Sequence, residues 1–204
     1  QVYHCFDRAR NVTETKIDPW QPLAWSLDFN VEPMCSVVAQ VRGGVIHVVD
    51  EIVMGRATTP EVCEEFLRRH GNHQGAVLIY GDASGSRRQT TGYSDYEMVR
   101  RALADGGRKS VSYRVPRANP EVRERVGLVN GLLRSAEGEA RLLIHPRCKE
   151  LILDLEQVMY KPGSQVLDKD RDSRRTHLSD ALGYLAWQEC RPKWRAGERG
   201  ERLF

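Results

Sequence analysis

The sequence predicts an α/β fold built on a mixed sheet, in which an antiparallel meander of three strands is followed by parallel crossover strands, with helices flanking the sheet. Three observations lead to this prediction. Residues 23–53 contain three apolar, strand-like segments, residues 59–71 have helical spacing, and a fourth apolar run at 76–80 ends in a glycine-rich turn. Because a helix separates this fourth strand from the meander, the strand is expected to be parallel to a neighbour.

The first strand is predicted from strict alternation after residue 23. Bulky Trp25, Leu27, Phe29 and Val31 alternate with small or polar residues, Asp28 among them. A period of two gives a strand one bulky face and one small or polar face. Asp28 therefore belongs to the polar face, near the end of the strand.

The next elements are a hairpin and a helix. Apolar runs at 35–41 and 45–53 flank Gly43-Gly44, which favours a tight hairpin because both turn residues need positive φ. Thr59 is expected to cap the helix that follows, and Pro60 suits its first turn.

The remaining residues are typical of further crossover units, and the chain divides into three parts. Residues 1–22 have no sustained period and are expected to be a linker, 23–190 form one domain, and 191–204 form a basic, mobile tail. Within the domain the pattern predicts helices at 95–104, 119–134 (entered through Pro120), 146–160 and 177–189, and strands at 110–115 and 141–144.

Composition limits the classes of function. The 204 residues carry a net charge of only +3, and no apolar run reaches the roughly 20 residues that cross a bilayer, so we expect a soluble protein without membrane contact. The five cysteines are odd in number, dispersed, and never in a C-x-x-C pair, which argues against a disulfide framework or a zinc ribbon. A reducing cytoplasm fits this usage.

Three acids occupy positions where a site could form. Asp28 ends the first strand, Asp82 follows the parallel strand at 76–80, and Asp180 lies in the first turn of the last helix if Thr176 is its N-cap. The carboxyl ends of strands are where sites form in open α/β sheets. Each acid also has a purely structural explanation: a turn for Asp28, a loop acid beside glycine for Asp82, and a favourable interaction with the helix dipole for Asp180.

Taken together, these positions match those that bring acids together in the RNase H-like fold, and the chain resembles the C-terminal nuclease domain of phage large terminases. The resemblance covers residues 23 to about 188. It is carried by the motifs Leu27-Asp28-Phe29-Asn30, Val49-Asp50-Glu51-Ile52, Tyr80-Gly81-Asp82-Ala83-Ser84-Gly85, His145-Pro146-Arg147-Cys148 and Thr176-His177-Leu178-Ser179-Asp180-Ala181.

The resemblance implies a metal-dependent endonuclease that cuts double-stranded DNA during viral genome packaging. Asp28, Asp82 and Asp180 would be both catalytic residues and metal ligands, holding two divalent cations, Mg²⁺ or Mn²⁺, which prefer hard oxygen donors. The partners it implies are double-stranded DNA, a preceding ATPase domain, a portal and a small terminase subunit. The location would be the host cytoplasm, at the procapsid, with the isolated domain monomeric. No phosphate loop of the type G-x-x-x-x-G-K-[ST] is present, so ATP hydrolysis is not expected from these residues.

Secondary candidates surround the three acids. Glu51 and Asp172 are reserve metal ligands, although an exposed strand end explains Glu51 and a solvated charge run explains Asp172. His177 could orient water or phosphate, or be a structural histidine. The residues expected to contact DNA phosphates are Arg87, Arg88, Lys169, Arg174 and Arg175.

Two other functions fit the same pattern. One is a different RNase H-like nuclease, of the junction-resolvase or transposase type, because a fold does not determine a substrate. The other is a DNA-binding or assembly module that keeps the fold without cutting.

Overall fold

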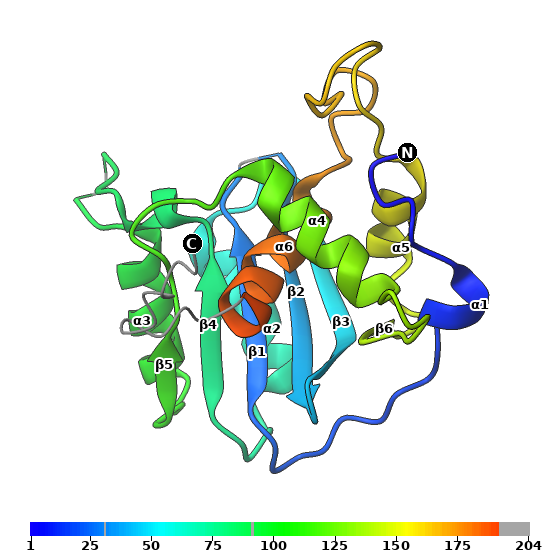
Figure 1. Ribbon diagram of the computed structural model, residues 1–204. Helices are drawn as coiled ribbons and strands as arrows, with labels where there is room; N and C mark the ends of the chain where they lie inside the picture. The colour runs from blue at the N-terminus through cyan, green and yellow to red at the C-terminus, as the bar shows by residue number, and fades with distance from the viewer. Residues whose placement is uncertain (31, 91, 192–204) are drawn as a thin grey trace, which may run out of the picture.

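A computed structural model describes residues 1–30, 32–90 and 92–191, and consists of one six-stranded sheet between two layers of helices (Figure 1). The strands are β1 (Leu23–Asp28), β2 (Met34–Arg42), β3 (Val45–Met54), β4 (Val77–Gly81), β5 (Val111–Tyr113) and β6 (Leu142–Ile144). The helices are α1 (Arg8–Asn11), α2 (Thr59–His70), the 3-10 turn η1 (Ala83–Ser86), α3 (Asp95–Asp105), α4 (Val122–Leu133), α5 (Lys149–Gln157) and α6 (His177–Cys190).

The sheet confirms the predicted topology. Its strand order is β5-β4-β1-β2-β3-β6. β2 is antiparallel to both of its neighbours, whereas β4 is parallel to β1, β5 to β4, and β6 to β3. Gly43 and Gly44 turn the β2–β3 hairpin with φ of 56° and 78°, the left-handed conformation that glycine adopts without strain.

Each face of the sheet has its own core. α4, α5 and α6 cover one face, and α2 and α3 cover the other (Figure 1). On the α2 side, Trp25 of β1 stacks on Phe66 of α2 with ring centroids 4.0 Å apart. On the other side, α6 lies across β1, β2 and β4 and is flanked by α4 and α5, so residues 178–186 are all buried.

The alternation predicted for β1 is confirmed, but the strand is shorter than expected. Leu23, Trp25 and Leu27 point into the α2 core, and Ser26 faces α6, where its hydroxyl donates to the carbonyl of Ala181 at 2.6 Å. β1 ends at Asp28, because the backbone N–H of Asn30 turns back to the carbonyl of Asp28 at 3.0 Å. Val31 lies outside the described residues.

Three predicted helix starts were wrong, and the simplest case is α5, which begins at Lys149 rather than at residue 146. The N-cap of α2 is Thr58 rather than Thr59, because Thr58 and Glu61 form a reciprocal capping box. α4 begins at Val122 rather than at residue 119, because the side chain of Asn119 is engaged with the turn after β4.

Residues 1–22 pack on the domain. Val2 and Tyr3 are buried in the core beneath α4 and α5. The Asn11 side chain donates to the carbonyls of Leu133 and Leu142 at 2.9 and 3.1 Å, which holds α1 against the start of β6. This segment is therefore ordered against the domain, and a domain boundary at residue 22 stays a prediction. The basic tail predicted from residue 191 lies outside the described residues beyond Arg191.

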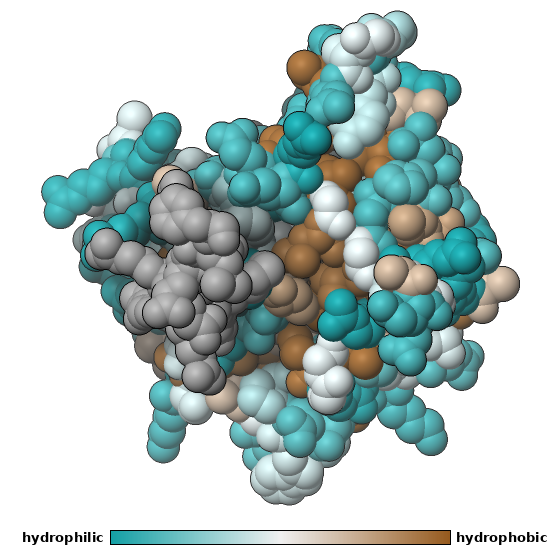
Figure 2. All heavy atoms as spheres, in the orientation of Figure 1, coloured by the Kyte–Doolittle hydropathy of each residue, from teal (hydrophilic) through white to brown (hydrophobic). Residues whose placement is uncertain are grey.

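The remaining surface features agree with the composition. All five cysteines are free thiols. Among the described residues, no helix combines the length and the apolar character that a bilayer crossing requires. Figure 2 shows hydrophilic side chains over most of the face that carries α4 and α6, with an apolar strip near its centre.

Candidate metal site

Two of the three predicted acids stand at neighbouring strand ends. Leu27 of β1 is in register with Gly81 of β4, and the two strands are parallel. The next residue in each strand is an aspartate, and the backbone N–H of Asp82 donates to the carbonyl of Leu27 at 3.2 Å. Asp28 and Asp82 therefore leave the sheet side by side, at the edge where open α/β sheets form their sites.

α6 brings the third acid to the same edge. The hydrogen bond from Ser26 to the Ala181 carbonyl fixes the first turns of α6 over the end of β1. One turn earlier, His177 Nδ1 lies 3.0 Å from Asp28 Oδ2. Asp180 lies between these two contacts in the helix, so the packing of α6 on β1 places it near Asp28.

Asp28 is a buried carboxylate with little positive charge around it. Its side chain is 5 % exposed, and Oδ2 accepts from Asn30 Nδ2 at 2.6 Å. Burial raises the pKa of Asp28 above its ordinary value, the hydrogen bond with His177 opposes this, and the charge of Asp180 adds to it. In turn, the hydrogen bond with Asp28 raises the pKa of His177, against the effect of burial.

Asp82 caps the turn that follows β4. Its Oδ1 accepts from the backbone N–H of Ser84 at 2.6 Å, which caps η1. The same oxygen accepts from Asn119 Nδ2 at 2.7 Å, and Asn119 Oδ1 accepts from the N–H of Ala83 at 2.8 Å. The structural explanation for this acid is therefore correct, and Oδ2 has no hydrogen-bond partner among the described residues.

Asp180 is bound by two cationic side chains. Arg125 of α4 donates to Oδ1 at 2.9 Å, and Lys169 Nζ lies 3.2 Å from Oδ2. The Arg125 side chain is 7 % exposed, and its guanidinium lies 4.4 Å from the centre of the Tyr184 ring. A buried arginine thus supplies positive charge to the third acid from the neighbouring helix.

The charges of all three acids influence the buried hydroxyl of Tyr184 on α6. Burial raises the pKa of its hydroxyl, Arg125 opposes this, and the charges of Asp82, Asp180 and Asp28 each raise it further. Each of these carboxylate charges disfavours ionisation of the Tyr184 hydroxyl. Within residues 1–30, 32–90 and 92–191, however, no three His, Cys, Asp or Glu side chains stand close enough to hold one ion together.

The donor chemistry of the site nevertheless fits a hard divalent cation. All three acids offer carboxylate oxygens, and the mutual effect of Asp180 on Asp28 is what a bound cation would relieve. Asp28, Asp82 and Asp180 are the residues that would hold such an ion. The assignment of the three as ligands stays a prediction.

The first turn of α6 is capped by a carboxylate that is remote in sequence. Thr176 is the N-cap residue, as predicted, but it makes no side-chain capping bond and has φ of 81°. Instead Asp154 of α5 accepts from the N–H of Ser179 at 3.2 Å and from Arg175 at 3.2 Å. Asp154 is 1 % exposed, and burial raises its pKa to about 7, with the Ser179 and Arg175 contacts opposing.

The reserve ligands are used elsewhere. Glu51 of β3 accepts from the backbone N–H groups of Glu150 and Leu151 at 2.9 and 2.8 Å, so it caps α5 and is not the exposed strand-end acid that its sequence favours. Burial raises its pKa, and these two bonds oppose the rise. Asp172 is held by Arg174 at 2.9 Å, which lowers the pKa of Asp172 to about 2.

The residues predicted to contact DNA separate into two groups. Arg87, Arg88 and Arg174 are exposed, and Lys169 is exposed beside Asp180. Arg175 is 7 % exposed and is bound to Asp154 and Glu150, so the prediction that it contacts phosphate is wrong. Its charge compensates buried carboxylates under α6.

Three functional side chains were missed by sequence reasoning: Asn119, Arg125 and Asp154. Asn119 precedes Pro120 and has the sequence of a helix start, which concealed its contact with Asp82. Arg125 and Asp154 fall at helical positions of α4 and α5 with no local sign that they would be buried. Only the packing of both helices on α6 gives these charges a partner.

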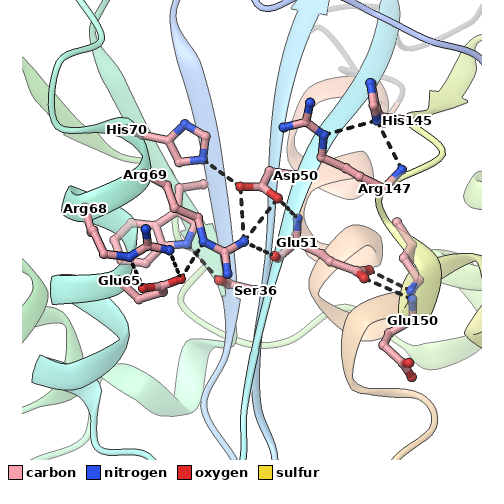
Figure 3. Close-up of polar contacts among 12 residues, drawn as sticks. Ser36, Asp50, Glu51, Glu65, Arg68, Arg69, His70, His145, Arg147 and Glu150 are labelled. Atoms are coloured by element: carbon pink, nitrogen blue, oxygen red, sulfur yellow. Dashed lines mark hydrogen bonds and ion pairs between the residues drawn. The ribbon is translucent and has the colours of Figure 1, made fainter.

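A second cluster of charged side chains lies between β3 and the last turn of α2, and Figure 3 shows it in detail. Asp50 points towards the last turn of α2, where it meets Arg69 at 3.2 Å and His70 at 3.1 Å. Burial alone would raise the pKa of Asp50, but the hydrogen bond from His70 and the charge of Arg69 outweigh it, and the pKa is lowered. Glu51, the next residue, points the opposite way, towards α5.

A family model for the terminase RNase H-like domain matches residues 27–188 of the chain. The chain belongs to this family. The matched residues include all three acids, the last residues of β1, the other five strands and most of α6. No curated protein matches the chain.

Solved structures of phage terminases share this fold. The large terminase of a thermophilic bacteriophage, in complex with ATP-gamma-S, matches with a TM-score of 0.64 and 19 % identity over 91 % of this chain and 44 % of that one. The P22 large terminase nuclease domain matches with a TM-score of 0.63 and 12 % identity, over 92 % of this chain and 89 % of that one. The nuclease domain of the bacteriophage SPP1 large terminase, with bound Mn, matches with a TM-score of 0.54 and 18 % identity, over 87 % of this chain and 94 % of that one.

These matches agree on the extent of the fold. This chain spans 44 % of the thermophilic phage's large terminase, whereas it spans most of each of the two isolated nuclease domains. The predicted fold class, a mixed RNase H-like sheet flanked by helices, is confirmed.

Proposed function

We propose that this terminase RNase H-like domain is a metal-dependent endonuclease that cuts double-stranded DNA during viral genome packaging. The observation that supports the proposal is that Asp28 and Asp82 follow paired positions of the parallel strands β1 and β4, while α6, which carries Asp180, packs on β1 through the Ser26 hydrogen bond. A divalent cation bound there would lower the pKa of an attacking water and stabilise the leaving oxygen of the phosphodiester. The SPP1 nuclease domain, solved with bound Mn, supports the choice of a divalent cation, Mg²⁺ or Mn²⁺.

The residues of the chain have separate parts in this proposal. Asp28 and Asp82, fixed at parallel strand ends, supply oxygen ligands, and Asp180 completes the set from α6. His177 orients Asp28 through its Nδ1 contact, and Asn119 orients Asp82. Arg125 and Lys169 compensate the charge of Asp180. Two ions, as the family resemblance implies, would need all three carboxylates.

The remaining partners follow from the same proposal. A chain that spans 44 % of the thermophilic phage's large terminase would act together with an ATPase domain, and the complex would work with a portal and a small subunit at the procapsid, in the host cytoplasm. The isolated domain would be monomeric.

The test is cleavage of supercoiled plasmid. We expect the purified chain to nick plasmid with Mn²⁺ and not with EDTA, and Asp82→Asn to abolish nicking while far-UV circular dichroism stays unchanged. Asp105→Asn is the matched control, because Asp105 is exposed at the end of α3 and the substitution removes the same charge. An intact plasmid with Mn²⁺ over a range of protein concentrations would leave a non-cleaving DNA-binding module as the function.

A further comparison separates terminases from other nucleases of this fold. A junction resolvase prefers branched DNA, whereas the proposed function predicts equal or faster cutting of linear duplex. Preferential cutting of a four-way junction over a duplex of the same length would contradict the packaging assignment and keep the nuclease.

A further inference from the structure

The structure contains a basic groove between the loop that follows β5 and the C-terminal end of α6. Its volume is 680 Å³. One wall is the loop between β5 and α4, which contributes Arg114 and Arg117, and the other is the end of α6, which contributes Trp187 and Glu189, followed by Arg191. We refer to it as the arginine groove.

The charge of the arginine groove is unbalanced. Three arginines face one glutamate along its described lining, a net charge of +2. Glu189 is already engaged by Arg114 and by the hydroxyl of Tyr80. Arg117 is exposed and takes part in no ion pair among the described residues, and Arg191 lies 5.7 Å from the Trp187 ring centre. The groove therefore offers positive charge that no acid of the described chain neutralises.

A second groove of similar size shows that arginine content alone does not produce this imbalance. The hollow beside Asp50, of 790 Å³, also has three arginines, Arg68, Arg69 and Arg147, but three acids line it as well, Asp50, Glu51 and Glu150. Its formal charge without histidine is zero. An anionic partner would be attracted to the arginine groove and not to this second one.

Both walls of the arginine groove connect to the candidate site. The loop that holds Arg114 and Arg117 is pinned to Asp82 two residues later, through Asn119. The helix that ends in the groove begins at the site: Asp180 and Trp187 are seven residues apart on α6, roughly 10 Å along the helix axis. This length corresponds to about three nucleotide steps of 3.4 Å along one strand of DNA.

We propose that the arginine groove binds the phosphate backbone of duplex DNA, about three nucleotides from the bond at the candidate site. The proposal rests on the proposed function for the identity of the substrate. Arg117 makes the most accessible phosphate contact, because it has no partner to lose in the described chain, and Arg114 and Arg191 flank it. The backbone is recognised by charge, without base readout, as a nuclease that cuts many sequences requires.

The test is the affinity for a 30-base-pair duplex, measured by fluorescence anisotropy in EDTA between 50 and 200 mM salt. We expect Arg117→Gln to lower the association constant roughly three- to tenfold at 100 mM salt, and to reduce the slope of log K against log salt by about 0.9, the value for one lost phosphate contact. Arg134→Gln is the matched control, an exposed arginine at the opposite end of α4. Arg114→Gln should have a smaller effect on affinity, because the Arg114 guanidinium is already paired with Glu189.

The outcomes are distinct from those of the cleavage test. Equal affinity and slope for Arg117→Gln and Arg134→Gln, or wild-type chain that does not bind the duplex, would overturn the groove assignment. Thermal melting shows whether each variant is folded, and Arg117→Gln is expected to melt like wild type because it removes no described contact. A chain that binds through the groove but never nicks with Mn²⁺ would retain this inference and refute the nuclease.

Discussion

The candidate site and the Asp50 cluster both bury a carboxylate beside a histidine, yet the pKa values move in opposite directions. Asp50 is bound by Arg69 and His70, and its pKa is lowered. Asp28 contacts His177, but burial and the charge of Asp180 both raise its pKa. A buried carboxylate that is bound by basic side chains can stabilise the fold. A buried carboxylate close to other acids lowers the stability of the fold unless a further cation binds there.

The largest expected difference is in cutting. Asp28→Asn should reduce nicking with Mn²⁺ by more than about a hundredfold, because the change removes a charged oxygen ligand, and a loss of this size corresponds to about 2.7 kcal/mol in the barrier. Asp50→Asn should leave the rate per folded molecule unchanged. The measurement is the initial rate of plasmid nicking. A large loss for both variants would mean that the two clusters are coupled.

The next expected difference is in the free energy of unfolding, where Asp50→Asn should have the larger effect and Asp28→Asn the smaller one. Asp50→Asn should lower the free energy of unfolding by about 2 kcal/mol, because Arg69 and His70 lose a charged acceptor at a buried position. Asp28→Asn should not destabilise the metal-free chain at pH 7, because it removes a buried charge next to Asp180. Urea unfolding monitored by circular dichroism checks this, and an Asp28→Asn variant that unfolds as easily as Asp50→Asn would contradict it.

The last expected difference is in the dependence of stability on pH, and it involves the carboxylate that caps α6. The pKa of Asp154 is raised to about 7 from an ordinary value near 3.8, so its contribution to stability is fully present below pH 4 and is lost as pH rises towards 7. The slope from one proton is about 1.4 kcal/mol per pH unit at most. Asp50, with a lowered pKa, contributes the opposite dependence, lost as pH falls through its pKa in the folded chain.

Asp154→Asn separates the two contributions. The variant should lose the part of the decline between pH 4 and 7 that belongs to Asp154, keep the part that belongs to Asp28 and Glu51, whose pKa values are also raised, and keep the decline at acid pH to which Asp50 contributes. Unfolding free energies at half-unit steps of pH would show this. An unchanged slope above pH 4 in Asp154→Asn would assign the titration to another group.

Most of the sheet could be predicted from local sequence, whereas the assignment of Asp28, Asp82 and Asp180 as metal ligands stays a prediction. Strict alternation in residues 23–28, the Gly43-Gly44 turn and the helix before β4 predicted the meander and the crossover, because side-chain period and turn conformation are local properties. The ends of β1, α2 and α4 were less well predicted. Each depends on one competing hydrogen bond, from Asn30, Thr58 or Asn119.

The surroundings of the acids were decided by tertiary structure. Arg125, Lys169 and Asn119 bind Asp180 and Asp82 from segments 11 to 55 residues away, and Asp154 and Glu51 cap helices that their own sequence leaves uncapped. Arg175, which reads as a surface charge beside other arginines, is buried by the same packing. Local sequence determines the direction in which a side chain leaves its strand or helix. Which helices pack over that edge of the sheet decides whether the carboxylate there meets a cation, an amide or another acid. The physical reason is that charge interactions act through space and not along the chain.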